Sequence, residues 1–287
     1  MFRAALVALD LSPAEVPIVD CLGDLRRWGV TRLVLTHVVR VGYAQGAGYG
    51  HEPDLLAWLE KRAVPLRATG LTVDVHVRAA GLPADEILAA AAETGADLVV
   101  VGSRSESRVP ALFLGSVARA VIHQSRLPVL LQWVEPTAEA TAEACAAVCP
   151  NMLQHVLLAT DFSKHATAAE RAATTLAKRS EYTTILHVMP PALCDATPLW
   201  PVMADAALAV IHGRIEAAGG RAEKLLVVGE PAPGIARIAG EKAVGLIIVG
   251  KHGQGWLDSL LIGSTAAAIC ETARRPVLMV PLAAVDG

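Results

Sequence analysis

The residues best suited to chemistry form a glycine-rich segment late in the chain. The segment follows the spacing Gly-x2-Gly-x9-Gly-Ser-Thr and consists of Gly250, Gly253, Gly263, Ser264 and Thr265. Glycines at the end of a strand let backbone N–H groups approach an anion without a Cβ atom in the way. The apolar stretch 265–273 predicts a helix, whose first N–H groups and positive dipole end favour phosphate. The spacing therefore predicts a phosphate-binding loop with two hydroxyl donors.

A carboxylate is expected beside this loop. Asp161 directly follows an apolar run that predicts the first strand of the second half, and Gly250 ends the run that predicts the fourth. In an open parallel sheet whose strand order reverses between these two strands, both carboxyl ends face one crevice. Asp161 could then accept from a ribose hydroxyl or from the adenine edge. Two simpler roles stay open: an ordinary turn at the glycines, and a helix N-cap at Asp161.

The elements that must position these residues occur twice. Asp10-Leu11-Ser12 corresponds to Asp161-Phe162-Ser163, and Leu35-Thr36-His37-Val38 corresponds to Ile185-Leu186-His187-Val188. Gly102 and Gly250 lie 148 residues apart, as do Gly115 and Gly263. Since the offset between matching residues changes by only three, from 151 to 148, the sequence predicts two consecutive copies of one domain.

Each half alternates short Val/Leu/Ile-rich runs with Ala-rich helical stretches, which is typical of a parallel sheet covered on both faces. The ten predicted strands are Ala4–Leu9, Arg32–Val38, Thr72–Val77, Leu98–Val101, Val129–Trp133, His155–Ala159, Thr183–Val188, Glu223–Val228, Leu246–Val249 and Val277–Val280. Helices are predicted between them, for example Pro83–Thr94 and Pro231–Lys242. The fold class is therefore α/β: two Rossmann-like domains, each a five-stranded parallel sheet flanked by helices.

The predicted boundaries are residues 1–135 for the first domain, 136–151 for a linker and 152–287 for the second domain. The Ala/Glu/Thr-rich stretch 135–151 is enclosed by prolines and has no counterpart before the first half, and we expect a helix in its middle. Cys145 and Cys149 would then lie one helical turn apart, where inert thiols are favoured over a metal or redox pair.

The composition bounds the function. The chain has 287 residues, 53% of them hydrophobic, and a net charge of −3 without a long basic run, which disfavours nucleic acid as a partner. No apolar run approaches the roughly 20 residues that span a membrane. The N-terminus reaches an acidic residue too early for the apolar core of a signal peptide, and five cysteines suggest reduced thiols in a cytoplasm. Motifs of P-loop NTPases, serine hydrolases and zinc proteases are missing.

The glycine motif, the aspartate and the Leu-His-Val strand together resemble the universal stress protein family in a tandem two-domain form. The resemblance covers nearly the whole chain outside the linker and implies an adenine nucleotide alpha hydrolase-like fold. It implies ATP, ADP or AMP, with or without Mg²⁺, held by Asp161, Val188, Val249, Gly250, Gly253, Gly263, Ser264 and Thr265. It also implies a stress-response role, cytoplasmic location and pairing of the domains through their fifth strands, and it leaves a homodimer open.

The first half departs from the motif, because Ser105 stands where the second half has Gly253. If that position needs a left-handed backbone, a side chain costs roughly 1–2 kcal/mol. A Ser105 hydroxyl could instead contact phosphate, and Arg104 would add charge. We expect a weaker site there, composed of Asp10, Val38, Val101, Gly102, Ser105, Gly115 and Ser116.

Lys251 and His252 lie inside the loop, and contact with the nucleotide and simple solvent exposure are both open for them. Three functions are compatible with the sequence. The favoured one is a binding and signalling module without catalytic residues. The second is a slow ATPase or nucleotide-dependent transferase, for which only Asp161 and His252 suggest themselves. The third is a scaffold that binds no ligand.

Overall fold

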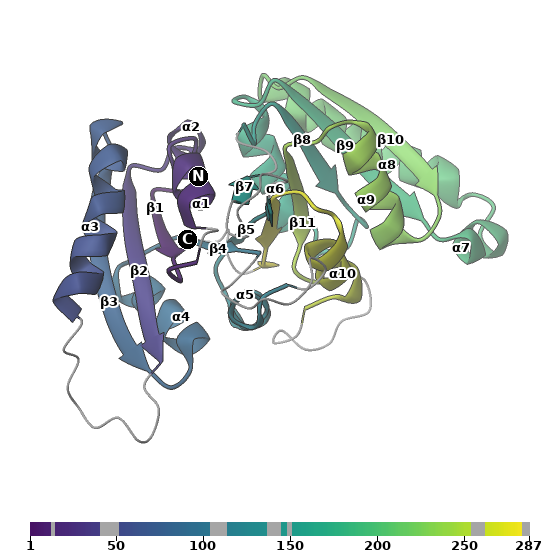
Figure 1. Ribbon diagram of the computed structural model, residues 1–287. Coiled ribbons are helices and arrows are strands. Elements are labelled where there is room, and N and C mark those ends of the chain that lie inside the picture. The colour runs from purple at the N-terminus through teal and green to yellow at the C-terminus, as the bar shows by residue number, and fades with distance from the viewer. Residues whose placement is uncertain are drawn as a thin grey trace. The chain divides into compact units, whose positions relative to one another are not determined.

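The computed structural model describes residues 1–12, 15–40, 52–103, 114–136, 145–147, 151–253 and 262–282. The chain divides into two compact units (Figure 1). The first comprises Met1–Ser125 and Val129–Ala147, and the second comprises Arg126–Pro128 and Val148–Gly287. Each unit is an α/β domain built on a parallel sheet, as the alternating pattern predicted.

The sheet of the first domain has the order β5-β4-β1-β2-β3, with every neighbouring pair parallel. Its strands are β1 (Ala4–Ala8), β2 (Arg32–Arg40), β3 (Thr72–Ala80), β4 (Leu98–Gly102) and β5 (Val129–Gln132). Its helices are α1 (Glu15–Leu22), α2 (Leu25–Trp28), α3 (Glu52–Ala68), α4 (Pro83–Glu93) and α5 (Ser116–Gln124). Helices α3 and α4 lie on opposite sides of β2 and β3 (Figure 1).

The second domain repeats this plan with the order β12-β11-β8-β9-β10, again parallel throughout. Its strands are β8 (His155–Ala159), β9 (Tyr182–Met189), β10 (Ala222–Val228), β11 (Leu246–Gly250) and β12 (Val277–Val280). Its helices are α6 (Thr167–Ala177), α7 (Pro191–Ala196), α8 (Trp200–Ala217), α9 (Pro231–Glu241) and α10 (Ser264–Thr272). Helices α6 and α8 pack against each other, and so do α9 and α10.

All ten predicted strands are present, because their apolar runs lie at the centre of each domain. Ala5, Leu6 and Val7 of β1 are fully buried, and so are the three central residues of β8. Such two-sided burial requires continuous apolar runs instead of alternation. In both sheets the first strand lies between the second and the fourth, which places the reversal of strand order where the sequence predicted the crevice.

The ends of the predicted linker form a small antiparallel ladder. Strand β6 (Val134–Pro136) pairs with β7 (Cys145–Ala147). Residues 137–144, where a helix was expected, lie outside the described residues, and so does Cys149. Cys145 belongs to a strand, so the helical spacing that was expected to relate it to Cys149 does not begin there.

Candidate functional site

The site of the second domain begins at a sharp corner after β8. Phe162 has a φ of 60°, a left-handed conformation, and the Asp161 carboxylate accepts a hydrogen bond from the Ser163 backbone N–H at 3.0 Å. The Thr160 hydroxyl accepts from the Phe162 N–H at 3.1 Å and donates to the buried Glu170 carboxylate at 2.8 Å. This chain of bonds holds the backbone on both sides of Asp161. The aspartate is therefore fixed by the turn that it caps.

The same corner exists in the first domain. Leu11 has a φ of 63°, and the Asp10 carboxylate accepts from the Ser12 N–H at 3.1 Å. A left-handed backbone at a leucine or a phenylalanine costs free energy that the surrounding structure must offset. Its recurrence in both halves indicates that the turn serves the placement of the aspartate.

A histidine from the neighbouring strand braces each corner. His187 Nδ1 lies 2.8 Å from the Thr160 carbonyl oxygen, and His37 Nδ1 lies 2.8 Å from the Leu9 carbonyl oxygen. Because a carbonyl only accepts, Nδ1 carries the proton and donates. Burial lowers the pKa of His187, which favours the neutral ring. The two histidines correspond in the repeat, and each ties its strand, β2 or β9, to the peptide that precedes the aspartate.

The His187 ring also packs between two aromatic side chains. Its centroid lies 4.5 Å from that of Phe162 and 6.4 Å from that of Trp200, the first residue of α8. His187 is only 4% exposed, and its Nε2 atom has no hydrogen-bond partner within the described parts of the chain. The ring is thus anchored through Nδ1 and through aromatic contacts.

The glycine loop approaches Asp161 closely. A Cβ atom on Gly253 would lie 2.7 Å from Asp161 Oδ2, closer than real Cβ contacts allow. A Cβ atom on Gly263 would lie 3.5 Å from the Gly253 nitrogen, and one on Gly250 would lie 3.1 Å from the His165 carbonyl oxygen. The three glycines therefore let β11, the loop and the start of α10 pack closely, and Gly253 lies against the Asp161 carboxylate.

Glycine at position 253 is not explained by a left-handed backbone, the reason considered from the sequence. Its φ does not lie in the left-handed region, so backbone conformation does not demand glycine there. Instead, the Asp161 carboxylate lies against this position, and a side chain there would have to push the carboxylate aside. The loop backbone is fixed on both sides of this position, because Lys251 N–H donates to the Val280 carbonyl at 3.0 Å and Gly263 N–H donates to the Lys251 carbonyl at 2.8 Å.

Helix α10 begins at Ser264, next to the loop. Gly263 is its N-cap and supplies no side-chain cap, so the first N–H groups of the helix are not satisfied by a capping side chain. Ser264 is exposed and Thr265 is half-exposed. An anion at this end would meet backbone donors, the helix dipole and two hydroxyls.

Three cationic or titratable side chains surround the loop. Lys251 is 3% exposed, and burial lowers its pKa to about 8. His252 is also buried, and its ring centroid lies 5.6 Å from that of His165, which precedes α6. Of the two roles left open for Lys251 and His252, simple solvent exposure does not hold, because both side chains are buried.

Val188 and Val249, to which the resemblance gives a place beside the nucleotide, lie one residue before the ends of β9 and β11, and both are buried. Gly234, which the sequence reading missed, packs against one of them: a Cβ atom there would lie 2.9 Å from Val188 Cγ1. Its Pro-Ala-Pro-Gly context at the start of α9 was the available signal.

The first domain builds the same frame. Ser103 N–H donates to the Gln132 carbonyl at 2.9 Å, and Gly115 N–H donates to the Ser103 carbonyl at 3.1 Å, matching the two bonds around Lys251. Gly102 ends β4 and Ser116 begins α5, while Val38 lies in β2 and Val101 in β4. Arg104 and Ser105, on which the expected weakening rests, lie outside the described residues.

Metal-binding groups and membrane-spanning helices can be assessed for the described part of the chain. Within it, no group of three or more His, Cys, Asp or Glu side chains is arranged to hold a metal ion. Nor does any helix there have the length and apolar character needed to cross a membrane.

Comparison with known proteins now decides the family. The family model described as the universal stress protein family matches residues 1–131 and again residues 152–281. The chain belongs to the universal stress protein family. It is a tandem member, with one family domain in each half.

Individual relatives agree with this assignment. A universal stress protein of Thermus aquaticus is 40% identical over 140 residues, covering 46% of this chain and 98% of that protein. One from Methanocaldococcus jannaschii is 34% identical over 70 residues, which is 24% of this chain and only 43% of that protein. The crystal structure of a universal stress protein from Archaeoglobus fulgidus matches with a TM-score of 0.69 at 25% identity, covering 97% of this chain and 96% of that one.

Proposed function

We propose that the second domain binds an adenine nucleotide at the carboxyl ends of β8 and β11, and that the tandem protein acts in a stress response through this occupancy. The observation that carries the proposal is the cradle formed where the Gly253 backbone approaches the Asp161 carboxylate so closely that a Cβ atom would lie 2.7 Å from Oδ2. Because the loop backbone and the carboxylate lie this close together, one ligand can touch both at once. Both flank the uncapped start of α10.

Each part of the site has a role that its chemistry suits. The backbone N–H groups of Gly253 and of the first turn of α10 would donate to phosphate oxygens, because that turn has no side-chain cap. The hydroxyls of Ser264 and Thr265 add donors, and protonated Lys251 adds positive charge. Each hydrogen bond to a charged group contributes roughly 1.5–3 kcal/mol, so four or five give roughly 6–15 kcal/mol before ordering costs, a range that includes the roughly 8 kcal/mol of micromolar binding.

The other end of the site suits the nucleoside. The Asp161 carboxylate would accept from ribose hydroxyls, and the backbone at Val188 and Val249 would border the base. ATP would bring Mg²⁺, which neutralises part of the phosphate charge. The first domain shares the aspartate corner and the loop frame, and we propose a weaker site there because of Ser105.

Binding without rapid turnover is the favoured form of this function. Hydrolysis needs a base and a metal ligand near the γ-phosphate. Asp161 is the carboxylate of the proposed site, and it already accepts the Ser163 N–H. His252, the other candidate, is buried against His165. Steady phosphate release lost in His252→Ala would favour the ATPase.

The test is calorimetric titration of three forms of the chain with Mg·ATP. Wild type is expected to bind at micromolar affinity or better. Gly253→Val is expected to lose binding, because its side chain fills the cradle. Gly240→Val in α9 is the matched control, since a Cβ at Gly240 meets nothing within 4 Å. Absence of binding by wild type, or equal binding by Gly253→Val, contradicts the proposal and favours the scaffold.

A further inference from the structure

A pocket of about 500 Å³ lies at the amino ends of β2 and β3 in the first domain. This volume is within the range of small-molecule sites. The described residues that line it include two guanidinium groups and no carboxylate: Gly23, Arg26, Arg27, Gly29, Val30, Thr31 and Gly70. The proposed nucleotide site belongs to the second domain and to the carboxyl ends of its strands, so this pocket is a separate place.

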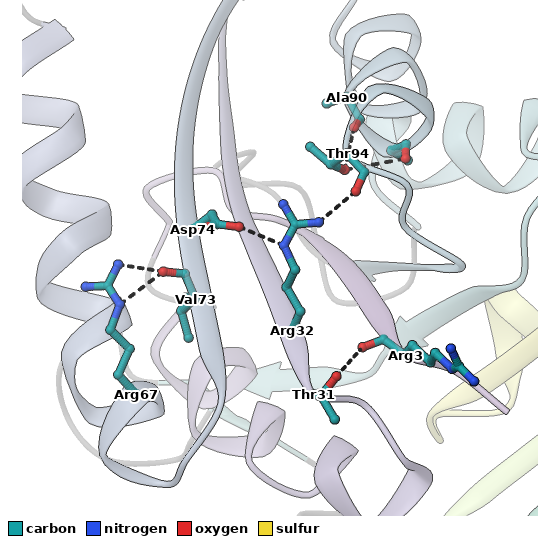
Figure 2. Close-up of polar contacts among 9 residues, drawn as sticks. Arg3, Thr31, Arg32, Arg67, Val73, Asp74, Ala90 and Thr94 are labelled. Atoms are coloured by element: carbon teal, nitrogen blue, oxygen red, sulfur yellow. Dashed lines mark hydrogen bonds and ion pairs between the residues drawn. The ribbon is translucent and has the colours of Figure 1, made fainter.

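Two turns of the main chain shape the pocket. Gly29 follows α2 with a φ of 103°, and Gly70 lies between α3 and β3 with a φ of 90°. Both values are left-handed and favour glycine, so no side chain fills the pocket at either turn. The Thr31 hydroxyl donates to the Arg3 carbonyl oxygen at 3.3 Å, which holds the turn before β2 against the start of β1 (Figure 2). The pocket therefore has a backbone wall, and its charge comes from α2.

Other arginines near this end of the sheet have structural partners. Figure 2 shows the Arg67 guanidinium directed at the Val73 carbonyl oxygen of β3, at 3.0 and 2.6 Å. Arg32 of β2 donates to the Asp74 carboxylate and to the Thr94 carbonyl oxygen, each at 2.8 Å (Figure 2). Each of these two side chains ties separate elements of the domain together.

Arg26 does not have such a role. Its guanidinium makes no hydrogen bond and no ion pair with the residues that the structure describes. A Cβ atom on Gly70 would lie 3.6 Å from Arg26 Nη2 and 3.7 Å from Cζ, so the guanidinium lies beside this glycine of the lining. Nor does the end of α2 need this cation, because the Gly29 N–H donates to the Arg26 carbonyl and the Val30 N–H to the Leu25 carbonyl. The Arg26 side chain is therefore available to a ligand.

Arg27 adds a second positive charge to the lining. Its guanidinium contacts the Asp24 carboxylate at 3.3 Å, and its side chain is 42% exposed. A guanidinium presents five N–H donors in a planar fork, and this exposure keeps the group accessible to a ligand. Phosphate oxygens match such forks, because two parallel N–H groups can donate to two of them.

The fold does not require this pocket, because the second domain closes the corresponding corner. There the end of α6 meets the turn before β10. A Cβ atom on Gly220 would lie 2.7 Å from Ala177 Cβ and 2.9 Å from Ile215 Cγ2. In the first domain the Arg26 guanidinium stands between the end of α2 and the turn before β3. The pocket is thus not part of what the two halves share.

We propose that this pocket binds a small anion that carries phosphate groups, held by the guanidinium groups of Arg26 and Arg27. The described lining offers positive charge and no negative charge, and the glycines at its turns leave room beside the two forks. Phosphate suits the pair better than a carboxylate does, because its oxygens project in several directions and can reach both forks at once. The site is independent of the nucleotide site, so either can exist without the other.

The test is a titration of the isotope-labelled full chain with inorganic pyrophosphate, followed through its amide NMR signals. Signals of single residues separate this pocket from the glycine loop of the second domain. Those of Gly29, Thr31 and Gly70 are expected to shift and saturate, with a dissociation constant of about 1 mM or tighter. Arg26→Gln is expected to weaken this binding by about tenfold or more. Arg237→Gln, the same loss of charge at an exposed arginine of α9, is the matched control and should bind as wild type.

A parallel titration with citrate distinguishes phosphate from carboxylate, and citrate is expected to bind more weakly at the same signals. Four results overturn the proposal. They are pocket signals that do not shift and saturate with pyrophosphate, Arg26→Gln that binds as tightly as wild type, Arg237→Gln that binds as weakly as Arg26→Gln, and citrate that binds as tightly as pyrophosphate. Residue 26 is exposed, so its replacement leaves the core intact, and the amide spectrum itself verifies that each variant is folded.

Discussion

His187 offers a sharp test of how the fold positions Asp161. Its Nδ1–H donates to the Thr160 carbonyl at 2.8 Å, one residue before the aspartate. His187→Leu removes the donor and leaves a buried carbonyl without that bond, which costs about 1–3 kcal/mol of folding stability. If the corner then relaxes, Asp161 also loses its hydrogen bond to the nucleotide. An interaction of roughly 1.5–3 kcal/mol corresponds to a loss of about tenfold to a hundredfold in affinity.

His187→Asn separates positioning from packing. The Asn amide N–H stands near the place of Nδ1–H and can donate to the Thr160 carbonyl, although the ring contacts with Phe162 and Trp200 are lost. Calorimetric affinity for Mg·ATP should therefore follow the order wild type, Asn, Leu, with Asn close to wild type. His37→Leu, the same change in the first domain, should leave the affinity of the stronger site unchanged. An Asn variant as weak as Leu, at equal thermal stability, would refute the positioning role.

The remaining predictions concern pH and the loop. Burial lowers the pKa of His187 in the folded state, so the unfolded chain binds more protons below about pH 6.5, and folding stability is lost as the pH falls through this range. The melting temperature should therefore fall between pH 7.5 and pH 5.5, and it should fall less in His187→Asn. Since the pKa of Lys251 is about 8, ATP affinity should decline as pH rises above that value, and Lys251→Met should bind more weakly with no such decline, as calorimetry can measure. Gly253→Ser, which introduces the residue of the first domain, should weaken ATP binding by about tenfold or more. Ser105→Gly should raise the number of ATP molecules bound per chain. An unchanged ATP affinity in Gly253→Ser would contradict the steric role of Asp161.

Much of the fold could be predicted because it depends on local composition. The buried strands β1 and β8 are continuous apolar runs. The repeat was revealed by the nearly constant offset between matching residues, such as Gly102 and Gly250. Pro83 and Pro231 begin α4 and α9, where a missing N–H is tolerated. The pairing of β6 with β7 could not be predicted in this way, because the Ala-rich composition around β7 indicates a helix more than a strand.

The sequence predicted that Asp161 and the glycine loop lie close together, but it did not predict the contact that requires glycine. Glycine spacing pointed to Gly253, but the contact that excludes a side chain comes from Asp161, distant in sequence. The burial of Lys251 and His252 likewise depends on packing by other elements, so their position in the sequence left solvent exposure open. His187 gave a signal, its repetition as His37, but a recurring residue does not reveal which carbonyl it binds.

The central claim, that the second domain holds an adenine nucleotide, is tested most directly by the nucleotide that the purified chain carries. The wild-type protein would be incubated with Mg·ATP, separated from free ligand and denatured, and the released nucleotide would be identified and counted by mass spectrometry. We predict about one adenine nucleotide per chain, and none for Gly253→Val. Wild-type protein that releases no nucleotide, while Gly240→Val and wild type remain equally well folded, would contradict the account.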